Sequence, residues 1–172
     1  HAKQDRPYND IERAAFKRDI KRARELATKE RQIKQDAAAS RALDIWNAAT
    51  LPHYDHPYLV RKCIDEACDC LNHDNTVKQF KDDIVLPIHD FNGNLTSLQF
   101  IKPDGSKRLL SGGRKKDCVI HIQNDLITCP NFFPHQVIIC EGWATGCTLA
   151  YQYPYATVLA AIDADNLKSV AL

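Results

Sequence analysis

The sequence predicts an α/β protein (α+β overall) with a long N-terminal helix, an antiparallel β meander and an incomplete parallel βαβ unit. Three observations predict this class. Apolar residues recur at helical spacing in the first third, and short alternating runs separated by turn residues fill the middle. Near the C-terminus an apolar run, a helical segment and a second apolar run follow one another, which is typical of parallel strands joined by a helix.

The first predicted element is a helix that starts near Asn9 and Asp10 and ends before Pro52. Residues 1–50 form a basic helical leader, with 12 Lys and Arg against 8 Asp and Glu in a chain of net charge +1. One interpretation is a solvated strut that its acidic and basic neighbours keep soluble. The other is a phosphate-facing stripe made by Arg13, Lys17, Arg18, Lys21, Arg22 and Arg24.

The middle region, residues 51–134, is predicted to be mainly β. A short helix at residues 58–62 precedes a hairpin, in which residues 83–89 and 95–101 flank a turn at 90–94. Further strands at 107–110 and 118–122 complete the meander. Pro87 places its strand at an edge or a bulge, and His53 and His56 are expected to be surface or capping groups.

A basic loop lies between the last two of these strands. Gly112 and Gly113 expose backbone amides, and Asp104 is the only carboxylate within residues 102–116. The loop is either a solvated surface or a binding site for nucleic-acid or nucleotide phosphates. Six cations fall within fifteen residues: Lys102, Lys107, Arg108, Arg114, Lys115 and Lys116.

Residues 135–172 are predicted to start an α/β domain. The apolar run 137–140 predicts a strand covered on both faces, followed by a helix over 143–153, a parallel strand over 157–162 and a helix from Asn166. Glu141 and Gly142 directly follow the first strand, at the sheet edge where α/β proteins bind ligands. Glu141 is therefore a candidate catalytic residue, and a plain helix cap is the structural alternative.

The chain has seven cysteines and no export signal, so reduced thiols are expected. A cluster of Cys63, Cys68, Cys70 and His73 invites a zinc interpretation, but it lacks the paired C-x2-C spacing of tetrahedral sites. We expect no zinc in this chain.

Several blocks in order resemble one protein family. The segments are 141–149 (EGWATGCTL) and 158–167 (VLAAIDADNL), preceded by 56–62 (HPYLVRK), 97–101 (SLQFI), and 107–108 with 112–116 (GGRKK). Together they resemble the toprim-domain DNA primases of plasmids, phages and integrated elements. The resemblance covers roughly residues 46–172, and it implies a primase-type β domain over 51–134 and the N-terminal part of a toprim domain over 135–172.

The resemblance implies template-dependent synthesis of RNA primers by nucleotidyl transfer with Mg²⁺ or Mn²⁺. Glu141 takes the catalytic and metal-binding role, with Gly142 and Thr145 supporting the site. Asp163 and Asp165 read as Asp-x-Asp, but they belong to the exit loop of the second strand and border the site. The family's metal-binding pair is expected beyond Leu172. Lys107, Arg108, Arg114, Lys115 and Lys116 are assigned to nucleic-acid or nucleotide binding.

The implied partners are a single-stranded DNA template and nucleoside triphosphates, with a helicase as a further candidate. No apolar run approaches the ~20 residues that span a bilayer, so we expect a cytoplasmic protein with no membrane partner. The absence of Met and the end at Leu172 suggest an inactive fragment. A non-catalytic module that binds single-stranded nucleic acid is the alternative function, and a purely structural α/β domain is a third.

Overall fold

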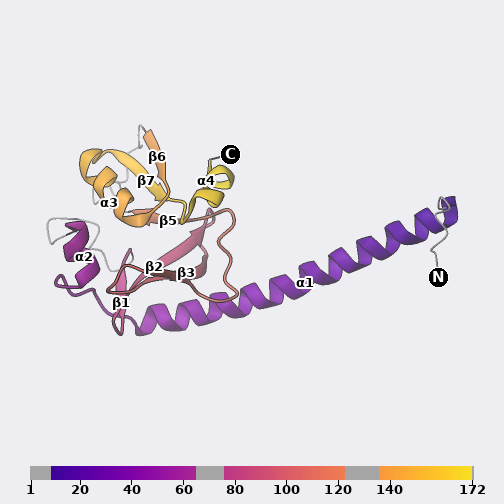
Figure 1. Ribbon diagram of the computed structural model, residues 1–172, viewed down its shortest axis with the longest axis horizontal. Helices are drawn as coiled ribbons and strands as arrows, with labels where there is room; N and C mark the ends of the chain where they lie inside the picture. The colour runs from indigo at the N-terminus through magenta and orange to yellow at the C-terminus, as the bar shows by residue number, and fades with distance from the viewer. Residues whose placement is uncertain (1–8, 65–75, 123–135, 172) are drawn as a thin grey trace, which may run out of the picture. The chain divides into compact units, whose positions relative to one another are not determined.

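The computed structural model describes residues 9–64, 76–122 and 136–171. The chain divides into two compact units, His1–Lys34 and Gln35–Leu172. The first contains the N-terminal part of helix α1, and the second contains the sheet and helices α2, α3 and α4 (Figure 1).

Helix α1 spans Asp10–Ala48, as its apolar spacing predicted. The Asn9 side chain accepts a hydrogen bond from the Glu12 amide at 2.8 Å, and the Glu12 carboxylate accepts one from the Asn9 amide at 2.9 Å. This capping box satisfies two amides at the helix start, and it confirms the predicted cap. Ile11 and Ile33 are exposed, so local interactions rather than core packing hold this part of the helix.

The second unit alternates short helices with strands. Most predicted boundaries are correct to within two residues. The elements are α2 (Pro57–Lys62), β1 (Lys78–Phe80), β2 (Asp83–Asp90), β3 (Leu95–Ile101), β4 (Lys107–Leu109), β5 (Cys118–Ile122), β6 (Gln136–Cys140), α3 (Trp143–Gln152), β7 (Ala156–Ala160) and α4 (Ala164–Val170).

The described strands form one mixed sheet in the order β4-β3-β2-β5-β7-β6, with β1 also paired to β2. The hairpin β2-β3 and the parallel pair β6-β7 are confirmed. The meander is wrong in its last step, because β5 pairs antiparallel with β2 instead of β4. Strand β5 then pairs with β7. Residues on both sides of position 134 thus share one sheet, and the three-region division stays a prediction.

Helices α3 and α4 cover opposite faces of the sheet around β5 and β7. Trp143 of α3 packs in one cluster with Ile120 and Ala160, whereas Val170 of α4 packs in another with Val119 and other residues. Neighbouring residues such as Val119 and Ile120 point to different clusters because successive side chains of a strand alternate between its faces.

Among the described residues the strand before Glu141 is an edge strand, and the prediction of a strand covered on both faces holds only for its carboxyl half. Strand β6 is last in the sheet order of the described residues, and Val137 is 57% exposed. Only its carboxyl end is covered, because Cys140 packs against α3 and Ile139 packs against the cluster of α4.

Pro87 lies in a central strand, so the predicted edge position is wrong for β2 as a whole. On the side of β2 away from β3, however, strand β1 pairs with residues 83–85 and strand β5 with residues 89–90. Pro87 falls between these two partners, just before an irregularity at Ile88 and His89. Its missing amide hydrogen therefore removes no ladder bond on that side.

Candidate functional site

Glu141 lies at the carboxyl end of β6, exposed to solvent and directly before α3. Gly142 is the N-cap of α3 with an extended backbone, and it provides no side chain to cap the first turn. The free amides and the positive end of the helix dipole therefore favour an anion here. The position of Glu141 at the rim of the sheet agrees with the sequence prediction.

A pocket of about 310 Å³ lies beside the start of α3. It is formed where the end of α2, the turn before β4 and the first turn of α3 meet. Three predicted site residues, Lys107, Gly142 and Thr145, come together in it, and Glu141 precedes Gly142 in the chain. The lining residues are Tyr58, Arg61, Lys62, Asp104, Gly105, Lys107, Gly142, Ala144 and Thr145.

Positive charge dominates the pocket, because Arg61, Lys62 and Lys107 face a single carboxylate, Asp104. The Lys107 Nζ lies only 3.6 Å from the position that a Cβ atom on Gly142 would occupy, so its ammonium sits next to the helix start. Hydrogen bonds from Ser106, helped by nearby cations, hold the pKa of Asp104 below its ordinary value. The pocket combines three cations with a helix N-terminus, a composition that suits a phosphate group.

Packing between α2 and α3 positions the cations. The His56 side chain caps α2 by accepting a hydrogen bond from the Tyr58 amide at 3.2 Å, which confirms the predicted capping role. The Tyr58 ring stacks on Trp143 with centroids 6.5 Å apart, and Arg61 lies 5.9 Å from the Tyr58 ring centroid. The Arg61 guanidinium also donates to the Pro103 carbonyl at 3.3 Å.

Tyr58 and Trp143 bring unpaired polar atoms into this contact. The Tyr58 hydroxyl and the Trp143 Nε1 are buried without a hydrogen-bond partner in the described part of the chain. Burial raises the pKa of Tyr58, so its hydroxyl stays protonated at neutral pH.

Two cations of the predicted basic loop are held by carboxylates instead of facing the pocket. Arg108 contacts Asp83 at 3.1 Å and lies over the Phe100 ring. Arg114 contacts Asp90 at 2.8 Å. Hydrogen bonds from Asn94, Asn92 and Arg114 lower the pKa of Asp90, so the carboxylate stays ionised in this turn. Sheet pairing brings both carboxylates close, which a count of charges along the loop does not reveal.

Asp163 and Asp165 lie in the exit region of β7, as the sequence predicted. Asp163 caps α4 by accepting a hydrogen bond from the Asn166 amide at 3.1 Å, and it forms an ion pair with Lys115. Asp165 is exposed in the first turn of α4. Lys116 is also exposed, and no ion pair involves it among the described residues.

The backbone directly before Asp163 is strained. Buried Ile162 adopts φ 79°, a conformation that is rare for a β-branched residue. Such backbone outliers cluster at active sites, ligand-binding segments and switch regions, and they persist only where the surrounding contacts hold them.

The described residues do not form a metal site by themselves. Glu141 offers an exposed carboxylate of the kind that Mg²⁺ accepts. No group of three or more His, Cys, Asp or Glu side chains in the part that the structure describes could hold an ion. Cys63 is exposed, and the other members of the considered zinc cluster, Cys68, Cys70 and His73, lie outside the described residues.

Sequence reasoning did not single out Arg61 and Lys62, which line the pocket, although both lie in a block that carries the family resemblance. The available signal was a pair of cations at the end of a short predicted helix. It also missed Asn166, a buried residue that links three segments. No sequence signal separates Asn166 from an ordinary exposed polar residue in a first helical turn.

These features define a mixed α/β domain with a cationic pocket at the start of a helix that follows a parallel strand. Among curated proteins, the chain is similar to a DNA primase TraC of Escherichia coli, with 36% identity over 88 residues. This match covers 50% of the chain and 8% of the relative. A second DNA primase TraC of Escherichia coli is 30% identical over 117 residues, which cover 67% of the chain and 7% of the relative.

The chain thus spans less than a tenth of the length of these relatives. The similarity indicates a primase-related origin. No model of a known protein family matches the chain, and no solved structure matches it. Among the described residues, no helix has both the length and the apolar character needed to cross a membrane.

Proposed function

We propose that this chain is part of a DNA primase that joins ribonucleotides on a single-stranded DNA template, and that the cationic pocket binds the phosphates of a nucleoside triphosphate. One observation carries the proposal: three cations surround the uncapped start of α3, one residue after an exposed carboxylate at the sheet edge. The similarity to DNA primases TraC supports this choice among the ligands that a phosphate pocket accepts.

The pocket offers complementary groups for a triphosphate. Arg61 can make paired hydrogen bonds to phosphate oxygens, whereas Lys62 and Lys107 act as mobile point charges. The Thr145 hydroxyl and the first amides of α3 are further donors. Asp104 repels phosphate, and its carboxylate is suited to accept a hydrogen bond from a ribose hydroxyl.

Glu141 is the proposed catalytic residue. Nucleotidyl transfer requires a 3′ hydroxyl to lose its proton as it attacks the α-phosphorus, and the bond from that phosphorus to pyrophosphate breaks as the new ester bond forms. A carboxylate beside the bound triphosphate can accept the proton. A Mg²⁺ or Mn²⁺ ion would neutralise the phosphate oxygens. Glu141 would supply one oxygen ligand, and the remaining ligands would come from outside the described residues. We also propose a toprim-type domain from residue 135 and a helicase as partner, both on the family resemblance.

The test measures ATP binding and primer synthesis in parallel. The variant Lys62→Gln with Lys107→Gln should weaken ATP binding at least about tenfold, because each lost charge-assisted hydrogen bond is worth roughly 1.5–3 kcal/mol. The matched control, Lys81→Gln with Lys168→Gln, removes two exposed lysines outside the pocket and should change binding less than about twofold. Equal loss in both would mean that net charge, and not the pocket, attracts ATP.

The catalytic arm uses Glu141→Gln in the full-length protein, which keeps the size of the side chain and removes its charge. Primer synthesis should be lost, while affinity for single-stranded DNA stays close to that of the parent. If Gln at this position leaves synthesis intact, Glu141 is not catalytic. If the parent protein binds single-stranded DNA but makes no primers, the non-catalytic binding module is the better assignment.

A further inference from the structure

The first unit carries a separate cationic surface on α1. At about 100° per residue, five exposed cations fall within an arc of about 80° on the helix circumference. Successive members are three, four or seven residues apart, and the row extends about 27 Å at 1.5 Å per residue. We name this arc the α1 cationic face, and its members are Arg13, Lys17, Lys21, Arg24 and Arg31.

Three of the five carboxylates in this segment are segregated from the face. Glu12, Asp19 and Glu30 fall within about 20° of one another, and about 100° or more from the cationic face. The two other carboxylates of the segment contact cations of the face, with Asp10 at 3.9 Å from Arg13 and Glu25 at 4.0 Å from Lys21. Such exposed pairs are weak and easily exchanged.

Three members of the face, Lys17, Arg24 and Arg31, make no ion pair among the described residues. Segregation of this kind leaves a positive row that an anionic polymer can follow.

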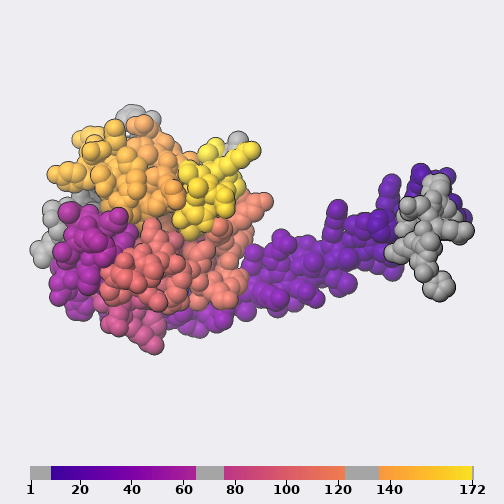
Figure 2. All heavy atoms as spheres, viewed as in Figure 1, coloured from indigo at the N-terminus to yellow at the C-terminus, as the bar shows by residue number. Residues whose placement is uncertain are grey.

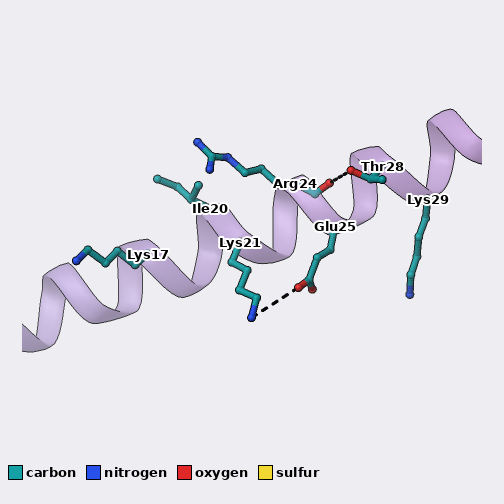
Figure 3. A pocket seen from close by; sticks show the side chains of 7 residues that line it. All are labelled: Lys17, Ile20, Lys21, Arg24, Glu25, Thr28 and Lys29. Carbon is teal, nitrogen blue, oxygen red and sulfur yellow. Dashed lines mark hydrogen bonds and ion pairs between the residues drawn. The ribbon is translucent and has the colours of Figure 1, made fainter. Parts of the chain in front are cut away.

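The surface of α1 is hollowed along this row. A shallow groove of about 650 Å³ is lined by side chains of this helix alone. In Figure 3, Arg24 and Ile20 project from one side of the helix, whereas Lys21, Glu25 and Lys29 project from the other. Cations therefore flank the groove on both sides.

We propose that the α1 cationic face binds the phosphate backbone of nucleic acid. A repeating negative polymer matches this row, in which the first four cations are three to four residues apart, about 4.5–6 Å along the helix axis, and Arg31 follows seven residues later. Nucleic acid as the partner rests on the proposed function. A membrane surface would require the cations to flank the apolar side chains, so that both reach the bilayer together. Ile11, Leu26 and Ile33 instead fall within about 60° of one another, about 80° or more from the cationic face and next to the carboxylates Glu12, Asp19 and Glu30.

The experiment compares two triple variants of the whole chain. Lys17→Gln, Arg24→Gln and Arg31→Gln neutralise three members of the face. The matched control, Arg18→Gln, Arg22→Gln and Lys34→Gln, removes the same charge from exposed positions outside the face and outside the groove lining. Gln is a good helix former, so circular dichroism should show unchanged helix content in both.

Affinity for a labelled single-stranded oligonucleotide, and separately for a duplex, is measured over a salt series. The face variant should lower the slope of log affinity against log salt by about 2 for the single strand and about 2.7 for the duplex. The control should change the slope by less than about 1. The larger loss of affinity identifies the preferred form of nucleic acid.

Equal slopes for both variants, or an unchanged slope for the face variant, would overturn the proposal. Binding to anionic lipid vesicles that depends on the same three residues would overturn it as well. ATP binding should be unaffected by the face variant, since the pocket lies in the other unit. If the face variant loses oligonucleotide binding but keeps ATP binding, the effect belongs to the α1 cationic face and not to the nucleotide pocket.

Discussion

Replacing Asn166 with Ala should be one of the most destabilising single changes in the second unit. The side chain is 3% exposed and all its hydrogen-bonding positions are used. Its Nδ2 donates to the carbonyls of Cys118 and Ala161 at 2.9 and 3.0 Å. Its Oδ1 accepts from the Asp117 amide at 3.2 Å and from the Ser169 hydroxyl at 2.9 Å. One residue thus joins the start of β5, the end of β7 and the helix α4.

The magnitude follows from the groups left behind. The Ser169 hydroxyl keeps its other bond to the Asn166 carbonyl, so its loss is small. Three backbone groups, on Cys118, Ala161 and Asp117, lose this partner, at about 1 kcal/mol each. The missing side-chain volume adds about 1 kcal/mol more. The expected loss is about 3 to 4 kcal/mol, a large part of the 5–15 kcal/mol typical of a domain.

Urea unfolding followed by circular dichroism measures this loss. With a slope of about 1–3 kcal/mol/M, the midpoint should fall by about 1 to 4 M. Asn92→Ala, at an exposed turn position, is the control and should stay within about 0.5 kcal/mol of the parent. A loss below about 1 kcal/mol for Asn166→Ala would show that these backbone groups find other partners.

Two further predictions concern other parts of the sheet. Gly113→Ala should cost about 1–3 kcal/mol of unfolding free energy, because its Cβ would lie 2.0 Å from the Ser97 Oγ. Adding Ser97→Gly should restore most of the loss, and a failure to do so would exclude that clash. His89 and His121 lie with ring centroids 6.1 Å apart, and burial lowers the pKa of both. At His89, repulsion from His121 lowers the pKa further, whereas Asp90 opposes the shift. Because the folded state disfavours their charged forms, stability should fall as the pH drops below about 6.5. The double variant His89→Gln, His121→Gln should show a smaller fall in urea titrations at pH 7.5 and 5, and an unchanged fall would refute the assignment.

The elements could be predicted because each carries a local signal. Asn9 with Glu12 forms the predicted start of α1, and the turn after Asp90 separates two apolar runs. The parallel pair β6-β7 follows from two apolar runs separated by a helical segment. The order of strands could not be predicted, because β5 pairs with β2 and not with β4, and this pairing joins residues that are far apart in the sequence.

The candidate site was only half predictable for the same reason. Lys107, Gly142 and Thr145 carried local signals, a basic strand start and a strand-to-helix turn. Arg61 and Lys62 enter the pocket only because Tyr58 stacks on Trp143, a contact between residues far apart in the chain. Tertiary packing of this kind leaves no local pattern in the sequence.

In the second unit, tertiary packing also determines which cations are paired with carboxylates. Figure 2 shows the segment around β4 and the following loop, in coral, between α2 in magenta and α4 in yellow. Along the sequence this segment is almost purely basic, but in the fold Asp83, Asp90 and Asp163 pair with three of its cations.

A phosphate must therefore compete with a carboxylate at each of these three cations, whereas Lys107 stands beside the uncapped amides of α3. Within the second unit, electrostatic attraction for phosphate thus converges on the pocket next to Glu141, and not on the basic loop that stands out in the sequence.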